Sequence, residues 1–448
     1  MIGQVGEAIA SASWAGLSLA AKEKLKHCVI ANFSVALAGL PFARLPEPAA
    51  APRGHFLFSG RRTAVARDAA FWNAAVMHAR TQDDFHPIGN LHAAAVLFPA
   101  AMAAAEASGA SGERFLDALT AGYVAAAGLS CAFSPLTTPK GLRSTGLYSP
   151  FAAAAAAGRL AGLDAAGLGN AVALSASIAG GLTQCWVDGS DEWQLHVAQA
   201  AANGMLAVDL TRAGVRGGDH ALDGKAGFFH AHAGVIPKFE DIAKDFDADR
   251  AVLDTVIKRY PVSGICQPVV RLAERIAARA PIATADIARV TIAMNPFEMR
   301  YPGTLNKGPD FRSFSDVLMS AAFCCASVLV NGRLEFKDLF ELRRPERDRV
   351  IAATEVRDDA ALPTLSCRID IELKSGGKLS DTLIDGGKEL AINAASIDEW
   401  ASALWREAGR TDAQYETFRN VLAVLEHPER GSAAGLLSAA SPSACGRP

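Results

Sequence analysis

Two acids and two histidines stand close together in the segment QDDFHPIGNLH, which covers residues 82–92. Asp83 and Asp84 precede His86 and His92, and a long run of small apolar residues follows. Carboxylates and imidazoles can bind a metal ion or transfer a proton, and polar residues also open helices. The separation of six positions between the two histidines fits no helical spacing of metal ligands. We therefore expect no metal, while a proton-transfer site and a polar loop that opens a helix both stay open.

Composition and the absence of known motifs exclude several classes of function. The sequence contains no GxGxxG or GxxxxGK[ST] loop, no HExxH zinc motif and no GxSxG nucleophile motif. The net charge is −3 and there is no basic tract, which argues against nucleic acid and anionic membrane surfaces as partners. The eight cysteines are scattered without a CxxC pair, which predicts buried free thiols in a reducing cytoplasm. No basic segment precedes an apolar stretch at the N-terminus, so we expect a cytoplasmic protein.

The elements that must position the polar residues are mostly helices. Alanine has the highest helix propensity, and it dominates four blocks of the first half, at 92–109, 116–133, 149–164 and 197–214. Several blocks stop near a glycine suited to a C-terminal cap, at Gly109, Gly162 and Gly214. The apolar run at 28–40 is too short to cross a bilayer and is predicted to be a buried helix.

The pattern changes near residue 250. Apolar and polar residues alternate at 288–295 and again at 366–385, where a Ser-Gly-Gly turn interrupts them, and this alternation predicts strands. The segments 315–332 and 396–409 are predicted to be helical, and the tail from Gly431 onward to be loose.

These elements predict a mainly α protein in two parts. A large all-helical domain is expected over residues 1–248 and 395–448, and a smaller inserted α+β domain over residues 249–394.

Several segments resemble the MmgE/PrpD family, which includes 2-methylcitrate dehydratase, cis-aconitate decarboxylase and iminodisuccinate epimerase. The acidic segment at 82–92 is similar to a family motif in which a histidine, here His92, opens a small-residue helix. Four further segments resemble family segments in the right order: GLRSTGLYSPFAAAAAAGRLAGLD, LHVAQAAANGMLAVDLTRAGV, LDGKAGFF and KRYPVSGICQPVVRLAERIA. The resemblance implies a helical domain with an α+β lid, a homodimer, no metal or organic cofactor, and a small anionic polycarboxylate as substrate.

The chain departs from the family pattern at residues that carry chemistry. Where the family has an acid, a histidine, a lysine and a second histidine, this sequence has Thr81, Arg143, Trp193 and Gln267. By the same alignment the sequence keeps Asp84, His92 and Lys258. A tricarboxylic substrate needs several cations to hold its carboxylates, so these losses argue for a simpler reaction, while Arg143 keeps a bidentate carboxylate clamp.

We therefore predict an isomerase that is most like iminodisuccinate epimerase. It would remove and return a proton at the carbon next to a carboxylate of a small amino-polycarboxylate. Lys258 and Tyr148 are the leading candidate proton carriers, with His86, His92 and Asp84 in reserve, while the predicted substrate-binding residues are Arg143, Arg259, Trp193 and Gln267. Two alternatives stay open: a lyase that dehydrates or decarboxylates a citrate-like acid, and a non-catalytic relative that binds a polycarboxylate.

Overall fold

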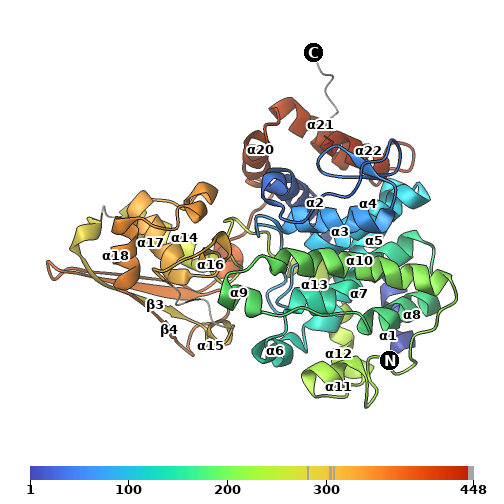
Figure 1. The fold of residues 1–448 in the computed structure, drawn as a ribbon, viewed down its shortest axis with the longest axis horizontal. Helices are drawn as coiled ribbons and strands as arrows, with labels where there is room; N and C mark the ends of the chain where they lie inside the picture. Colours follow the sequence, from blue (N-terminus) through green and yellow to red (C-terminus); the bar gives the residue numbers. More distant parts are fainter. Residues whose placement is uncertain (280–281, 302–304, 306–307, 442–448) are drawn as a thin grey trace. The chain divides into compact units, whose positions relative to one another are not determined.

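The computed structural model describes residues 1–279, 282–301, 305 and 308–441. Over these residues the chain is mainly helical with a small mixed sheet (Figure 1), so the predicted fold class is confirmed. The chain divides into two compact units. The first consists of Met1–Gly181, Gln194–Thr255 and Asn393–Pro448, and the second of Leu182–Trp193 and Val256–Ile392.

The first unit is a helical assembly. Its longer helices are α1 (Ile2–Ser11), α2 (Leu19–Gly39), α3 (Ala66–His78), α4 (Ala94–Ser108), α5 (Gly112–Ser130), α7 (Ser144–Leu160), α8 (Ala165–Ala176), α10 (Glu192–Arg212), α20 (Ile397–Glu407), α21 (Asp412–Ala423) and α22 (Ala433–Ala440). The first two residues of α10 belong to the second unit, and the rest of this helix belongs to the first. Helix α7 packs against α4, α5 and α8, and α20 packs against α2. The alanine side chains of α7, and those of α4 as far as Ala105, are buried, and small residues of this kind let helix backbones approach closely.

The ends of the alanine-rich helices confirm the predicted glycine caps. Gly109, Gly162 and Gly214 have φ values of 60°, 78° and 83°. This left-handed conformation terminates a helix at low cost only for glycine.

Helix α2 contains the apolar run at 28–40 and continues it toward the N-terminus. With the turn that follows, Leu19–Phe42 is long and apolar enough to cross a membrane by length and composition, and 72% of its most apolar window is buried inside the protein. The buried stretch from Cys28 to Gly39 packs in the core of the helical unit, as the sequence predicts.

The second unit is built on a four-stranded sheet with the order β4-β3-β5-β6. Its strands are β3 (Ile287–Met294), β4 (Thr354–Asp358), β5 (Cys367–Leu373) and β6 (Lys378–Leu383). Strand β4 is parallel to β3, while β5 is antiparallel to both β3 and β6. Helices α14 (Gln267–Arg279), α17 (Ala321–Asn331) and α18 (Pro345–Ala352) pack against this sheet (Figure 1). The predicted strands and the β5–β6 hairpin are therefore confirmed.

Two element predictions need correction. The segment 315–332 is not one helix, because α16 (Phe314–Val317) ends before Ser320 caps the separate helix α17 through Phe323. The tail from Gly431 is not loose as far as the described residues extend, since α22 buries Leu436 and Leu437. Residues 442–448 lie outside the described part of the chain.

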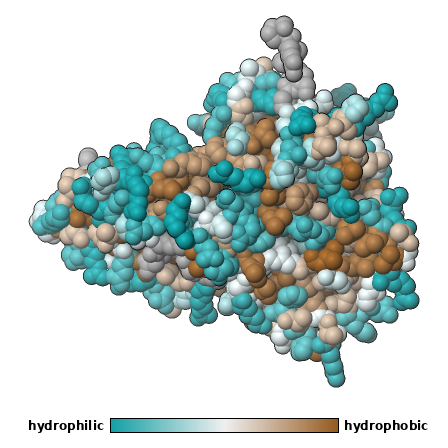
Figure 2. All heavy atoms as spheres, viewed as in Figure 1, coloured by the Kyte–Doolittle hydropathy of each residue, from teal (hydrophilic) through white to brown (hydrophobic). Residues whose placement is uncertain are grey.

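Hydrophobic side chains also reach the surface. Figure 2 shows brown areas scattered among hydrophilic residues on the visible face. The large exposed hydrophobic residues of the helical unit include Leu19, Val65, Ile88, Leu136, Leu195, Val215, Ile236 and Leu253. Scattered exposure of this kind is common on folded proteins and by itself indicates no binding site.

Candidate active site

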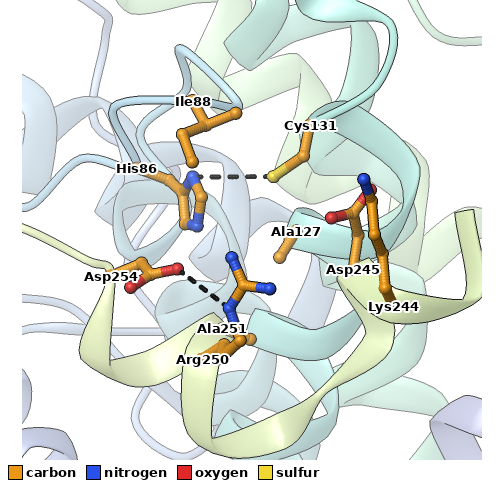
Figure 3. Close-up of a pocket in the computed structure, with 9 residues that line it drawn as sticks. All are labelled: His86, Ile88, Ala127, Cys131, Lys244, Asp245, Arg250, Ala251 and Asp254. Atoms are coloured by element: carbon orange, nitrogen blue, oxygen red, sulfur yellow. Dashed lines mark hydrogen bonds and ion pairs between the residues drawn. The ribbon is translucent and has the colours of Figure 1, made fainter. Parts of the chain in front are cut away.

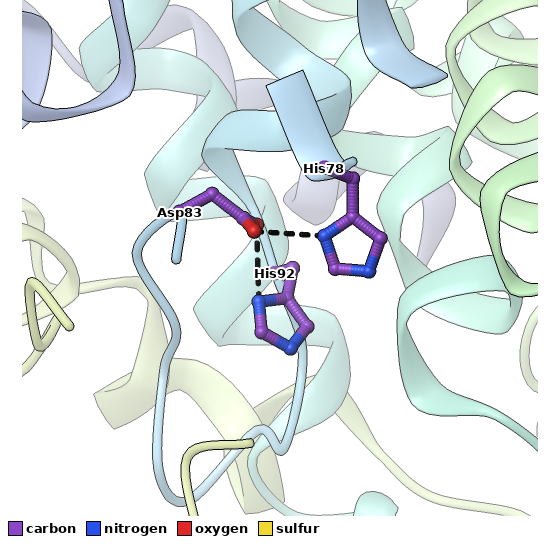
Figure 4. A group of neighbouring side chains, drawn as sticks. All are labelled: His78, Asp83 and His92. Carbon is purple, nitrogen blue, oxygen red and sulfur yellow. Dashed lines mark hydrogen bonds and ion pairs between the residues drawn. The ribbon is translucent and has the colours of Figure 1, made fainter. Parts of the chain in front are cut away.

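A buried aspartate joins two histidines in the first unit (Figure 4). His78 is the last residue of α3, and Asp83 and His92 lie on the loop that leads to α4. One carboxylate oxygen of Asp83 lies 2.8 Å from Nδ1 of His78, and the other lies 3.0 Å from Nδ1 of His92. The ring centroids of the two histidines are 4.7 Å apart. The side chains of Asp83 and His78 are 0% and 1% exposed, whereas that of His92 is 19% exposed.

The partners of each ring determine where its proton lies. Nδ1 of His92 faces the Asp83 carboxylate and also lies 3.1 Å from the carbonyl oxygen of Asp84, so it must donate. In the neutral ring, Nε2 of His92 then carries the lone pair. Nδ1 of His78 also donates to Asp83, and its Nε2 accepts from Nη2 of Arg143 at 2.7 Å.

Arg143 brings a guanidinium to this group and connects it to a third histidine. Nη1 of Arg143 lies 3.4 Å from Nδ1 of His196, which is on α10. Arg143 itself is the residue before α7, and its main-chain N–H donates to the carbonyl of Gly181 at 2.9 Å. A Cβ on Gly146 would lie 2.3 Å from the carbonyl oxygen of Gly180, so only glycine permits this close approach.

Burial keeps His78 and His196 neutral, whereas the neighbouring histidine rings keep Asp83 charged. Desolvation lowers the pKa of His78 to about 3 and that of His196 to about 3, and the nearby Arg143 charge acts in the same direction. Burial alone would raise the pKa of Asp83, but the two histidine rings hold it well below its ordinary value. The site therefore combines one fixed anion, one guanidinium and neutral imidazoles.

The loop that carries Asp83 and His92 has a strained residue two positions before each of them. Thr81 and Asn90 have positive φ values of 52° and 50°. Threonine is β-branched and rarely adopts this conformation, which costs about 1–3 kcal/mol. Strain of this kind often occurs at functional sites.

His78, Asp83 and His92 also have the residue types and the proximity of a metal site. One potential ligand atom from each of His78, Asp83 and His92 lies within 4.8 Å of the others, and the ligand types suit a transition metal. However, the two oxygens of the Asp83 carboxylate already face ring nitrogens of His78 and His92 at 2.8 and 3.0 Å, and Nη2 of Arg143 lies 2.7 Å from Nε2 of His78. A cation at this position would have to displace the ring protons and tolerate the charge of Arg143, so the donor set fits proton transfer better.

Asp84 occupies the centre of a separate hydrogen-bond network behind the loop. It is fully buried, and its carboxylate accepts from Tyr123 at 2.5 Å, Asn32 at 3.0 Å and the main chain of Ala94 at 3.3 Å. Burial raises the pKa of Asp84 to about 6, although these donors act in the opposite direction. These donors hold the carboxylate in place, while the Asp84 carbonyl contacts His92. The catalytic prediction for Asp84 stays a prediction.

Two predicted proton carriers of the first unit lie in other surroundings. Tyr148 is fully buried on α7, its hydroxyl lies 3.0 Å from that of Thr137, and burial raises its pKa well above the ordinary value of a tyrosine. A tyrosine base requires a shift in the opposite direction. His86 lines a different pocket (Figure 3), where Nδ1 accepts from the main chain of Gly89 and burial lowers the pKa to about 4. Figure 3 shows its ring beside Cys131, whose Sγ lies 3.7 Å from Nδ1 of His86.

The remaining predicted residues belong to the second unit. Lys258 is fully buried there, and Arg259 donates to the carbonyl of Ala391. Trp193 is fully buried and gives its indole N–H to Ser315 at 2.9 Å. The catalytic prediction for Lys258 and the binding predictions for Arg259 and Trp193 stay predictions.

Gln267 makes hydrogen bonds to the main chain of the loop at residues 260–262 in the second unit. Its amide donates to the carbonyls of Tyr260 and Val262 at 2.8 and 3.1 Å and accepts from the N–H of Tyr260 at 3.0 Å. These bonds hold the loop between Tyr260 and Val262, and the predicted contact of Gln267 with a substrate stays a prediction.

Sequence reasoning missed His78 and His196 as site residues and gave Asp83 no role. His78 follows an apolar stretch of α3, five positions before Asp83, and resembles an ordinary buried helix residue. A histidine that ends an apolar helix just before an acidic loop is the one local signal that could have identified it. His196 lies in the LH pair of the segment LHVAQAAANG, which was used for the resemblance alone.

Comparison with known proteins adds the family. Residues 3–238, more than half of the chain, match the MmgE/PrpD N-terminal domain. The chain belongs to the MmgE/PrpD family. The sequence resemblance is thereby confirmed at the level of the family, and the described cluster lies within the matched part of the MmgE/PrpD chain.

Two relatives carry the names of decarboxylases. A cis-aconitate decarboxylase-like protein of Aspergillus oryzae is 26% identical over 355 residues, which cover 73% of each chain. Human cis-aconitate decarboxylase is 26% identical over 331 residues, which cover 70% of this chain and 66% of the human protein. Within the MmgE/PrpD family, the predicted likeness to iminodisuccinate epimerase and the homodimer stay predictions.

Proposed function

We propose that this chain is an enzyme that moves a proton at the carbon next to a carboxylate of a small organic acid, with His92 as the base. One observation carries the proposal: Asp83 directs the proton of His92 to Nδ1 and thereby leaves the lone pair on Nε2, in a ring that is partly exposed. The His92 ring lies 4.7 Å, centroid to centroid, from the His78 ring that Arg143 contacts. Membership of the MmgE/PrpD family and two relatives named for cis-aconitate support a small carboxylic acid as substrate.

The chemistry uses three groups in turn. A substrate carboxylate binds the guanidinium of Arg143, which can hold it with two parallel hydrogen bonds. Nε2 of His92 then takes the proton of the adjacent carbon, so that the C–H bond breaks, an N–H bond forms and the electron pair moves onto the carboxylate. Asp83 stabilises the imidazolium that results, because its buried carboxylate lies 3.0 Å from Nδ1.

We further propose that the proton returns to the opposite face of the carbon, which makes the reaction an epimerisation of an amino-polycarboxylate such as iminodisuccinate. The alignment supports this choice, since the family lysine and second histidine are replaced by Trp193 and Gln267. The indole N–H of Trp193 and the amide of Gln267 make hydrogen bonds within the protein, and neither side chain carries a positive charge for a third carboxylate. Proton transfer needs fewer charged groups than dehydration or decarboxylation of a tricarboxylic acid.

A lyase is the second candidate, because both relatives are named for cis-aconitate decarboxylation. In that reaction carbon dioxide leaves and the carbanion that remains takes up a proton. The same histidine, once protonated, would supply that proton, so the cluster is compatible with both reactions.

Incubation with candidate acids in deuterated water distinguishes the two reactions. An epimerase introduces one deuterium at the stereocentre of iminodisuccinate and inverts that centre without loss of carbon. Release of carbon dioxide from cis-aconitate, with no exchange into iminodisuccinate, would replace the isomerase by the lyase. Tight binding of both acids without exchange or turnover would refute catalysis and leave a binding protein.

A further inference from the structure

We propose that Asn32 and Tyr123 are positioning residues, which align the ring of His92 by fixing Asp84 between two helices. The inference rests on the proposed role of His92 as a base, but it concerns residues that do not touch the cluster of His78, Asp83 and His92. Asn32 lies on α2 and Tyr123 on α5, far apart in the sequence.

Asn32 holds Asp84 at both its main chain and its side chain. The amide oxygen of Asn32 accepts from the main-chain N–H of Asp84 at 3.2 Å, and the amide nitrogen donates to the Asp84 carboxylate at 3.0 Å. The same nitrogen donates to the carbonyl of Cys28 one turn earlier, at 2.8 Å, which fixes the direction of the amide. Asn32 is fully buried, so water does not compete for these bonds.

Tyr123 holds the same carboxylate from the other side. Its hydroxyl donates to the Asp84 oxygen that Asn32 also contacts, at 2.5 Å. The Tyr123 ring is buried and packs edge-on against Phe98 of α4, with centroids 6.1 Å apart. Asp84 therefore has little freedom to rotate or to shift along the loop.

Asp84 in turn contacts both the ring of His92 and the main chain just after it. Its carbonyl lies 3.1 Å from Nδ1 of the His92 ring, and its second carboxylate oxygen accepts from the main chain of Ala94, two residues after His92, at 3.3 Å. The first contact orients the ring and the second fixes the start of α4. Since a misplacement of about 1 Å can cost a hundredfold in rate, this double contact matters for a base.

Buried hydrogen bonds from Asn32 and Tyr123 to Asp84 would also form if these two residues only stabilised the fold. The test therefore needs measurements that a loss of stability alone does not change. The groups that face Asp84 are Cys28 and Asn32 from α2, Tyr123 from α5, and Asp83 and His92 from the loop. The Tyr123 hydrogen bond favours the charged carboxylate, so its loss raises the pKa of Asp84. The acid limb of the turnover profile should then move to higher pH by about one unit.

The experiment compares Tyr123→Phe and Asn32→Leu with the matched control Tyr415→Phe. Tyr415 also gives its hydroxyl to a carboxylate, that of Asp398, but lies on α21. The ¹⁵N spectrum of the histidine side chains reports the tautomer of His92 in the full chain without any substrate. We expect a loss of the single Nδ1–H tautomer in Tyr123→Phe and Asn32→Leu and an unchanged spectrum in the control.

The outcomes separate this inference from the proposed function. An unchanged His92 signal in both Tyr123→Phe and Asn32→Leu would overturn the inference, whatever the reaction turns out to be. Where turnover is measurable, kcat should fall about tenfold in Tyr123→Phe, with KM within about threefold of the wild type. A fall in kcat that is equal at every pH, with an unshifted acid limb, would reduce Tyr123 to a structural residue.

Discussion

Replacement of Asp83 by asparagine tests how the proton on His92 is placed. The carboxylate accepts from Nδ1 of His78 at 2.8 Å and from Nδ1 of His92 at 3.0 Å, with one oxygen for each ring. Asparagine offers one oxygen and one NH₂ group, so one ring must face a donor and become an acceptor at Nδ1. His78 resists this exchange, because its Nε2 already accepts from Arg143 at 2.7 Å. The proton of His92 therefore moves to Nε2, where it blocks the base.

The size of the effect follows from the remaining contacts. General base catalysis contributes about 10²- to 10⁴-fold. The carbonyl of Asp84, 3.1 Å from Nδ1 of His92, still favours the productive tautomer. The loss should therefore be near the lower end, at about a hundredfold in kcat or about 2.7 kcal/mol in activation free energy.

The assay is initial-rate turnover of Asp83→Asn, with Asp254→Asn as the matched control. Asp254 acts electrostatically on His86 in the pocket of Figure 3, as Asp83 does on His92 in the cluster of Figure 4. The control should retain wild-type rates. A kcat for Asp83→Asn within about threefold of the wild type, in a folded protein, would refute the tautomer argument.

Further predictions concern the neighbouring groups. Arg143→Ala should raise KM at least about tenfold, because the guanidinium that holds the carboxylate is lost, and Arg143→Lys should raise KM less. An unchanged KM of Arg143→Ala in saturation kinetics would show that Arg143 does not bind the substrate. Tyr148→Phe should keep turnover and lower the free energy of unfolding by about 1 kcal/mol, because the hydrogen bond to Thr137 is lost. Lys258→Ala should abolish turnover if Lys258 is the second proton carrier. Loss of turnover in Tyr148→Phe with normal turnover in Lys258→Ala would exchange their roles. His196 has a lowered pKa of about 3, so the unfolded chain binds a proton below pH about 6.5 that the folded protein does not, and stability falls as the pH drops from there toward 3. His196→Gln should flatten this dependence by up to about 1.4 kcal/mol per pH unit in urea titrations, and an unchanged slope would contradict the assignment.

Local patterns were sufficient for much of the fold. Alternation at 288–295 and 366–385 predicted β3 and the β5–β6 hairpin, because the two faces of a strand differ in burial. At the C-terminus the prediction from composition was wrong: serine, alanine and glycine suggested a loose tail, but residues 433–440 form α22. Leu436 and Leu437 provide the apolar face that secures α22 to the helical unit, a contact that local composition does not reveal.

The candidate site was harder to predict, because its residues meet only in the tertiary structure. The acidic segment and His92 were recognised by residue type, but the partner of Asp83 is His78 at the end of the preceding helix. Burial also argues against one predicted proton carrier: the hydroxyl of Tyr148 is buried and lies 3.0 Å from that of Thr137. Sequence alone does not indicate which of several polar groups is desolvated, and desolvation decides which group can act as a base.

The central claim is that Nε2 of His92 faces the carbon that loses its proton while Arg143 holds the adjacent carboxylate. A crystal structure with a bound dicarboxylate tests it most directly. The account predicts a carboxylate on the guanidinium of Arg143 and the neighbouring carbon about 3–3.5 Å from Nε2 of His92. A dicarboxylate bound elsewhere, or bound on Arg143 with that carbon turned away from His92, would contradict the claim.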